Sequence, residues 1–299
     1  MLNIIKYYKF WMAVSGILLI AAIVSLSLYG LKPGIDFTGG ALMQEQFQGS
    51  VPAAPDIEQV ISDAGTAGAQ VQTASGNVVN IRTSPIDSDQ HNKILDALKA
   101  KFGDITEQQY TSIGPVIGKE LRSSAIWMLV LVSLFIVFYI AFAFRHVTRP
   151  VSSWRFGWAA IVALLHDLVI VLGVFSLLGH FLGVEVDTLF VTAMLTVLGF
   201  SVHDTIVVFD RIRENLRLRA GTSLPEIINS SINQTLIRSL NTSLTVAFVL
   251  LAMLLFGGVT IRYFVLALLV GIIAGTYSSI YIASPILIIW HNRDLRRRK

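Results

Sequence analysis

Apolar residues along this chain are gathered into long blocks instead of alternating with polar ones. Six blocks reach the length of about 20 residues that an α-helix needs to cross a bilayer. They are residues 11–29, 125–144, 158–178, 188–209, 236–256 and 263–290. The last block is long enough to tilt or bend, and Pro285 near its end supplies a cause. The pattern predicts a polytopic α-helical membrane protein with six transmembrane helices.

One long polar segment, residues 31–122, separates the first block from the second. Its apolar positions follow a βαββαβ order, which is that of a ferredoxin-like fold. Strands are expected at 41–47, 69–74, 78–83 and 105–112, and helices at 55–64 and 90–102. The segment therefore predicts one folded α+β domain outside the bilayer.

Composition agrees with a membrane protein. Of the 299 residues, 54% are hydrophobic and only 14% are charged, and the mean hydropathy is +0.67. A soluble chain of this length would carry about a quarter charged residues. There is no cysteine, which excludes a disulfide framework and a thiolate metal site.

Lysine and arginine decide the expected orientation. Residues 1–10, 145–157, 210–235 and 291–299 hold most of the 23 basic residues, whereas the loop 179–187 holds none. By the positive-inside rule both termini are cytoplasmic, and residues 31–122 are external. The basic tail is then read as part of the topology signal and not as a nucleic-acid site.

These features divide the chain into four parts. Residues 1–30 form a cytoplasmic stub and the first transmembrane helix, which we expect to stay uncleaved because it lacks a convincing A-x-A site. Residues 31–122 form the external domain, residues 123–290 hold five transmembrane helices with the cytoplasmic linker 210–235, and residues 291–299 form a basic cytoplasmic tail. In the linker, Ser223 and Glu226 have the spacing of a capping box, and an apolar side predicts a helix lying on the membrane surface.

An acidic residue, Asp204, lies inside the fourth block at about 9 Å from its charged end. An ionised carboxylate at that depth costs about 2.5 kcal/mol or more unless it is paired, so it is protonated or faces a cation or a wet cavity. Ser201 and Thr205 share its side of the helix and offer hydroxyls. Such acids are usually functional; the alternative is a buried structural hydrogen bond.

A basic residue, Arg238, lies near the inner boundary of the fifth block and is the natural counter-ion of Asp204. Thr242 and Thr245 continue a polar stripe from Arg238 into the block. The alternative is that Arg238 only extends into the lipid headgroups. Its position leaves both interpretations open.

A second His-Asp dipeptide, His166-Asp167, lies in the third block and repeats His203-Asp204. Two buried pairs suggest a proton path, in which His166 and Asp167 are relay or structural residues. A metal site is disfavoured, because adjacent helical residues point about 100° apart. Neither HExxH nor GxSxG occurs, so we expect no catalytic residue, no metal and no cofactor.

Four motifs, in order, carry a resemblance to a known family. They are GIDFTGG at 34–40, LHD at 165–167, DTIVVFDRIREN at 204–215 and QTLIRSLNTSLT at 234–245. The first places Asp36, Phe37, Gly39 and Gly40 in an external turn, which could also be only a glycine turn entering a strand. Essentially the whole chain resembles the SecF family, subunits of the bacterial Sec protein-export machinery within the RND transporter superfamily. The resemblance implies half of an RND-type bundle.

The resemblance also implies an accessory to the translocation channel and not an enzyme. Members pair with SecD, each supplying six spans, and the pair uses the proton motive force to help export unfolded polypeptides through the Sec channel. The chain would then lie in the bacterial cytoplasmic membrane with membrane lipid around it. Asp204 resembles the family's proton-site aspartate and Arg238 its partner arginine, while another carboxylate would come from SecD or a SecD half. His203 stands where Asn is frequent and adds a titratable group to proton coupling.

Three other functions stay open at this point. An RND-type exporter could move lipid or small molecules with the same proton machinery, although fewer than 100 external residues leave little room for a substrate-binding headpiece. An intramembrane enzyme could use His166-Asp167 as its base, but no nucleophile is evident. A purely structural subunit would have to bury Asp204 and Asp167 without a task.

Overall fold

The computed structural model describes residues 2–297 except 74–75, 144–152 and 220. It divides into two compact units, one of Met1–Lys32 with Trp127–Lys299 and one of Pro33–Ile126. The first is a helical bundle and the second holds the sheet.

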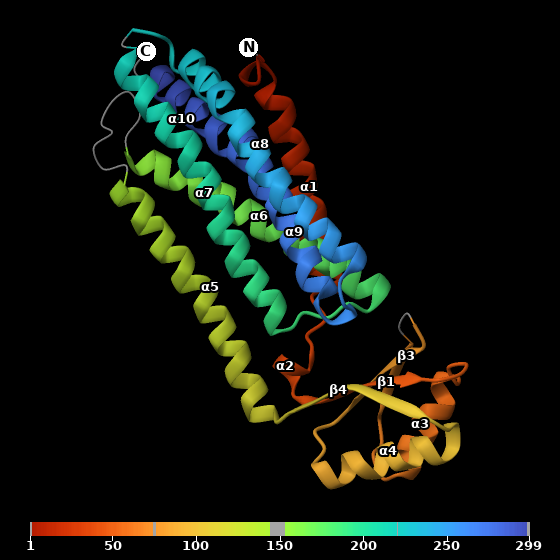
Figure 1. Cartoon of the computed structure of the whole chain (residues 1–299). Helices are drawn as coiled ribbons and strands as arrows, with labels where there is room; N and C mark the ends of the chain where they lie inside the picture. The colour runs from red at the N-terminus through yellow and green to blue at the C-terminus, as the bar shows by residue number, and fades with distance from the viewer. Residues whose placement is uncertain (1, 74–75, 144–152, 220, 298–299) are drawn as a thin grey trace. The chain divides into compact units, whose positions relative to one another are not determined.

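The bundle is built from long apolar helices (Figure 1). After the short 3-10 helix η1 (Ile5–Tyr7), they are α1 (Tyr8–Tyr29), α5 (Pro115–Ala143), α6 (Ser153–Leu182), α7 (Thr188–Leu218), α8 (Leu224–Phe256), α9 (Arg262–Ser278) and α10 (Ser284–Arg297). The short 3-10 helix η2 (Val259–Ile261) precedes α9. Among the described residues six segments are long and apolar enough to cross a membrane. Each contains one expected block, except that residue 144 of the second block lies outside the described residues. The prediction of six transmembrane helices is confirmed, with helices longer than the apolar blocks.

The last span is irregular in its backbone hydrogen bonding. A π-helical turn, η3 (Ser279–Ala283), joins α9 to α10 and ends two residues before Pro285. Proline has no backbone N–H, so the regular ladder cannot continue through it, and a π turn is one way to absorb the defect. The Ser284 hydroxyl donates to the Ser279 carbonyl oxygen across this turn at 3.1 Å.

The prediction that the linker forms a helix on the membrane surface is wrong. Residues 210–218 continue α7, and residues 224–235 are the first turns of α8, so the linker is a hairpin between two long helices. Ser223 precedes α8 without a side-chain capping bond, so the capping box is not formed. The isoleucines that predicted membrane-surface contact, Ile227, Ile228 and Ile232, are buried against the rest of the bundle. An amphipathic helix can bury its apolar face against protein as well as against lipid, and the pattern alone does not distinguish them.

Burial is uneven across the bundle. The last span and α7 are the most buried, whereas α1, α5 and α8 expose most of their length. Phe156, Phe209 and Ile212 belong to a core cluster that also takes in residues of α8 and α10. The exposed faces would meet lipid or another protein in a membrane.

The second unit is a four-stranded antiparallel sheet with helices on one face (Figure 1). The short helix α2 (Ile35–Thr38) precedes β1 (Gly40–Phe47), α3 (Ala54–Asp63), β2 (Gln70–Thr73), β3 (Val78–Thr83), α4 (Ser88–Phe102) and β4 (Ile105–Ile113). The strand order is β2-β3-β1-β4, and every neighbouring pair is antiparallel. This is the ferredoxin-like arrangement, so the predicted α+β fold is confirmed. Its core packs Met43 and Ile81 of the sheet against Ile57, Ile61 and Ile94 of the helices.

A carboxylate occupies the core face of this sheet. Glu45 alternates with Met43 and Phe47 along β1 and is fully buried, and neither of its carboxyl oxygens has a hydrogen-bond partner among the described residues. It lies opposite Glu107 of β4 in the strand register. Burial and, to a smaller extent, the charge of Glu107 raise the pKa of Glu45 to about 7, although the charge of Lys99 opposes both.

We expect this domain to lose stability as the pH rises. Because Glu45 binds a proton more tightly in the folded than in the unfolded chain, its contribution is fully present below the unfolded pKa of 4.5 and is lost as the pH rises through about 7. The shift corresponds to about 3 kcal/mol in the free energy of unfolding. The measurement is urea unfolding of residues 31–122, which we expect to fold alone as a monomer, at pH 5 and pH 8. Glu45→Gln should flatten the difference, whereas Asp96→Asn, at an exposed position of α4, should leave it intact. An unchanged pH dependence in Glu45→Gln would contradict this assignment.

Candidate functional site

Helix α7 places the predicted acidic residue inside the bundle. Asp204 is 5% exposed, and Ser201 and Thr205, on the same side of the helix, are buried with it. His203 is exposed, because a step of one residue turns the side chain about 100° around the helix. The expected shared side of Ser201, Asp204 and Thr205 is thus what the structure has, and His203 points away from it.

A different carboxylate has the richest contacts. Asp167 of α6 is 1% exposed and accepts hydrogen bonds on Oδ2 from the Ser201 hydroxyl of α7, at 2.5 Å, and from the Ser278 hydroxyl of α9, at 2.8 Å. The neighbouring His166 places Nδ1 3.0 Å from Oδ1 of Asp167. Asp167 thereby joins three helices in the middle of the bundle. This is the arrangement of a structural hydrogen-bond centre and also of a relay.

Asp204 is the less satisfied of the two carboxylates. Its Oδ2 is buried and has no hydrogen-bond partner among the described residues. The Ser239 hydroxyl of α8 faces this carboxyl but makes no hydrogen bond of ordinary geometry with it. Leaving a buried acceptor unpaired costs about 1–3 kcal/mol, and more for a charged one. An acid that no structural contact requires is a better candidate for proton binding than one held by three partners.

Serines and threonines continue this polar layer along the bundle. The hydroxyl oxygens of Thr205 and Ser279 lie 3.1 Å apart. Those of Ser243 in α8 and Thr276 in α9 lie 2.6 Å apart. Together with Asp167, Ser201 and Ser278, these groups form a polar seam between α6, α7, α8 and α9. Hydroxyls both donate and accept, so such a seam can pass a proton or hold water.

The expected partnership of Asp204 with Arg238 is not formed within this chain. Arg238 is exposed on the outer side of α8, while the next residue, Ser239, is buried. Among the ion pairs that the structure describes, none joins Arg238 to Asp204. The sequence placed the two residues at compatible depths, but depth does not fix the direction in which a helical side chain points.

The predicted polar stripe on α8 is present and faces outward. Arg238, Asn241, Thr242 and Thr245 are all exposed. Thr242 donates to the Arg238 carbonyl oxygen at 3.0 Å, and Thr245 to that of Asn241 at 2.7 Å, so the threonines are satisfied by their own helix. The exposed guanidinium of Arg238 and the exposed side-chain amide of Asn241 are therefore available to a molecule outside the chain.

Helix α7 also presents polar or small residues outward. Thr192, Thr196, Gly199 and His203 are exposed and recur at intervals of three or four residues, which places them on one face. Small residues at that spacing let a second helix approach closely in a membrane. The outer faces of α7 and α8 therefore suit another protein better than lipid.

The glycine motif forms a tight turn before β1 in the second unit. Gly39 has φ +75° and Gly40 has φ +138°, which L side chains rarely adopt. A Cβ on Gly39 would lie 2.9 Å from Cα of Pro115, and one on Gly40 would lie 2.9 Å from the Thr83 carbonyl oxygen. Asp36 and Phe37 belong to the short helix α2 just before this turn. Gly39 lets the entry to β1 pass close to the start of α5, and Gly40 lets it pass close to the end of β3.

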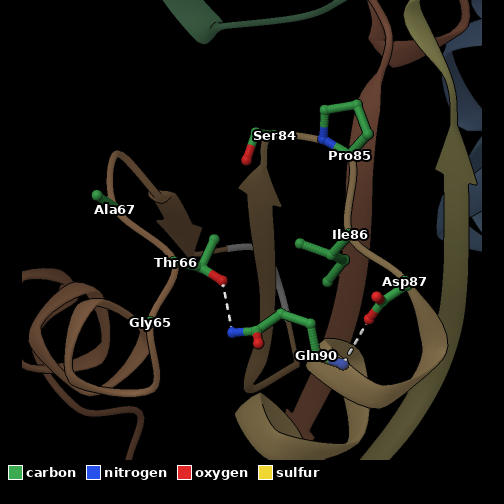
Figure 2. Close-up of a pocket in the computed structure, with 8 residues that line it drawn as sticks. All are labelled: Gly65, Thr66, Ala67, Ser84, Pro85, Ile86, Asp87 and Gln90. Atoms are coloured by element: carbon green, nitrogen blue, oxygen red, sulfur yellow. Dashed lines mark hydrogen bonds between the residues drawn. The ribbon is translucent and has the colours of Figure 1, made fainter.

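A cavity of about 510 Å³ in the same unit is lined by turns at the ends of its strands (Figure 2). Gln90 crosses it and donates through Nε2 to the Thr66 hydroxyl at 2.9 Å and to the Ala64 carbonyl oxygen. Asp87 accepts from the Gln90 backbone N–H and so caps α4. Asp87 is the one titratable side chain in the lining, so the cavity offers no acid–base pair.

One of these residues, Ser278, was not singled out from the sequence, because serine in an apolar span is common and Ser278 lies in a different helix from Asp167. Ser239 falls within the motif at 234–245, but no role at the site was predicted for it. A usable signal was the pair Ser278-Ser279 inside an apolar run. The Ser278 hydroxyl donates to Asp167, and the Ser279 hydroxyl forms a hydrogen bond with that of Thr205. Across the described residues no group of three or more His, Cys, Asp or Glu is placed to hold a metal.

Comparison with known proteins covers the whole chain. The family model for the protein export membrane protein SecD/SecF, C-terminal, matches residues 93–293, and that for the SecD/SecF GG motif matches residues 24–51. The protein translocase subunit SecF of Thermobaculum terrenum is 47% identical over 99% of this chain and 96% of the relative. That of Anaerolinea thermophila is 41% identical over 99% and 96%. A crystal structure of SecDF, a translocon-associated membrane protein from Thermus thermophilus, matches with a TM-score of 0.85 at 34% identity, over 98% of this chain and 39% of that one.

Proposed function

Because the chain belongs to the SecD/SecF family of protein-export membrane proteins, we propose that it is the SecF subunit of a bacterial Sec translocase. In this role it works with SecD and uses the proton motive force to promote export of polypeptides across the cytoplasmic membrane. The observation that carries the proposal is a similarity to SecF subunits that extends over 99% of the chain. The buried acid Asp204, whose Oδ2 has no hydrogen-bond partner among the described residues, supports the proton-driven part.

The partner is a SecD protein or a SecD half. The matched SecDF chain is longer, and this chain corresponds to 39% of it. The outward polar faces of α7 and α8 support a second membrane protein there, because Arg238 and Asn241 would otherwise meet hydrocarbon. The Sec channel and the exported polypeptide are the further partners of this proposal.

Proton coupling takes place between Asp204, Arg238 and the partner. Asp204 takes up a proton from the external side and becomes neutral, which weakens its attraction for cations nearby. Loss of the proton to the cytoplasm restores the charge, and helices repack between the two arrangements. In this scheme Arg238 senses the charge together with a carboxylate of SecD. His203, on the outward face, adds a second titratable group at the same depth.

The orientation follows from the charges. With basic residues concentrated in the short terminal and linker segments, both termini lie in the cytoplasm and the ferredoxin-like unit lies outside. There the unit can meet a polypeptide that emerges from the channel. In this proposal the role is that of an accessory subunit and not of an enzyme, which the similarity to SecF translocase subunits supports.

The experiment is purification from its own membranes in mild detergent. The proposal expects a second six-span protein of the SecD type to co-purify in equal amount. Cells depleted of the chain should accumulate unprocessed precursors of exported proteins. A chain that purifies alone and whose depletion leaves export unchanged, but which transports a lipid or a small molecule, would favour the RND-type exporter instead.

A further inference from the structure

At one end of the bundle, where α6 begins and α10 ends, the protein has an open cavity of about 300 Å³. This is the end at which the two termini lie (Figure 1). Arg155 and Trp158 of α6 and Trp290, Arg293 and Asp294 of α10 line it. Nothing in the proton-coupled role uses these residues, which lie at the limits of two membrane-spanning segments.

The lining is rich in hydrogen-bond donors. Arginine and tryptophan side chains carry N–H groups and no acceptor, so four of the five lining residues can only donate. The single acceptor, Asp294, is engaged by Arg155, with Oδ2 2.5 Å from Nη2. Arg293 is exposed and makes no ion pair with a described residue. The cavity therefore has positive charge, at Arg293, that no described carboxylate of the chain neutralises by an ion pair.

We propose that this cavity binds the phosphate of an anionic phospholipid headgroup. Basic pockets at the ends of transmembrane helices bind such headgroups, and tryptophan is typical of the depth at which headgroups lie. Trp158 is 57% exposed and Trp154, one turn earlier in α6, is 63% exposed, which suits contact with the upper acyl chains beside the phosphate. The inference needs the chain to span a membrane but does not depend on export.

Asp294 tunes the site in this arrangement. Its carboxylate lies where the lipid phosphate would approach Arg155, so the two anions compete for one guanidinium. Removing the carboxylate and removing the guanidinium break the same ion pair but should have opposite effects on lipid binding. A contact that only holds α6 to α10 would respond to both changes in the same direction.

The test is lipid binding to the full chain, purified in detergent, stripped of lipid and titrated with phosphatidylglycerol in native mass spectrometry. Arg155→Gln and Arg293→Gln should each weaken binding by about fivefold, the effect of one basic residue at an anionic surface. Asp294→Asn should strengthen it. Arg262→Gln changes an exposed arginine at the start of α9 and should leave binding unchanged. Phosphatidylcholine, which has no net charge, should bind more weakly to the wild type.

Several outcomes would overturn the proposal. Equal binding of both lipids, or an Arg293→Gln variant that binds like the wild type, would remove the charge-based site. Arg293 makes no described ion pair, so its variant keeps the test valid if Arg155→Gln does not fold. Weaker binding in Asp294→Asn would make the ion pair purely structural. Displacement of the lipid by soluble glycerol phosphate at equal concentration would indicate a site for a free phosphate ester.

Discussion

Asp204→Asn is expected to abolish the chain's contribution to export while leaving the protein folded, inserted and bound to its partner. The amide has nearly the shape of the acid and mimics its protonated form, but it cannot titrate. Because Oδ2 of Asp204 has no hydrogen-bond partner among the described residues, the change breaks no described bond to that atom. Export should fall to the level of cells that lack the chain.

The measurement is pulse-chase labelling of an exported precursor in cells that carry only the variant. Asp210→Asn is the matched control, since it removes an exposed carboxylate from the same helix beyond the apolar block. The control should export normally, and both variants should reach wild-type protein levels. Full export with Asp204→Asn would mean that the proton site lies elsewhere, with Asp167 as the next candidate.

Arg238 should be sensitive to the geometry of its charge as well as to its presence. A cation that only reaches headgroups needs no more than positive charge, so Arg238→Lys would then be nearly silent. A cation that engages a carboxylate through a fixed fork should lose about one charge-assisted hydrogen bond in the lysine variant, roughly tenfold in a binding equilibrium. Arg238→Met should lose more, because it also removes the charge. We expect both to impair export, with Met the worse.

The exposed position of Arg238 sharpens this comparison. The partner of the guanidinium has to come from outside the chain, so both variants should also loosen the complex or slow its cycle without unfolding the subunit. Arg217→Met, at an exposed position in the last turn of α7, is the control for a lost surface charge. Wild-type export by Arg238→Lys would support the headgroup role and leave Asp204 to find its cation elsewhere.

The extended segments of the fold could be predicted from the sequence because their patterns are strong. Long apolar blocks must form α-helices in a bilayer, because their backbone groups have to be paired within the segment. In the second unit, the alternation along β1 and β3 determines which side chains face α3 and α4. The linker was different. Its apolar side fits a membrane surface and a protein core equally well, and the choice depended on Phe209 and Ile212 being available to pack against Ile228.

The candidate site could be predicted by residue type and depth but not by direction. Asp167 and Asp204 were found because acids are rare at membrane depth, yet their environments differ. Asp167 meets hydroxyls from two other helices, and no periodicity within α6 contains that information. Arg238 and Ser239 show the same limit, since one residue of rotation decides which of them enters the bundle. The burial of Glu45, in contrast, is visible in the local sequence, because its position alternates with those of Met43 and Phe47 on the core side of β1.

The most direct test of the account is the release of a stalled export intermediate in inverted membrane vesicles, with and without an imposed proton gradient. The vesicles carry the chain with its SecD partner, as wild type or as Asp204→Asn. The account predicts that the gradient speeds completion of translocation in wild-type vesicles and has no effect in Asp204→Asn vesicles that contain equal amounts of the complex. Equal acceleration in both would contradict proton coupling through Asp204.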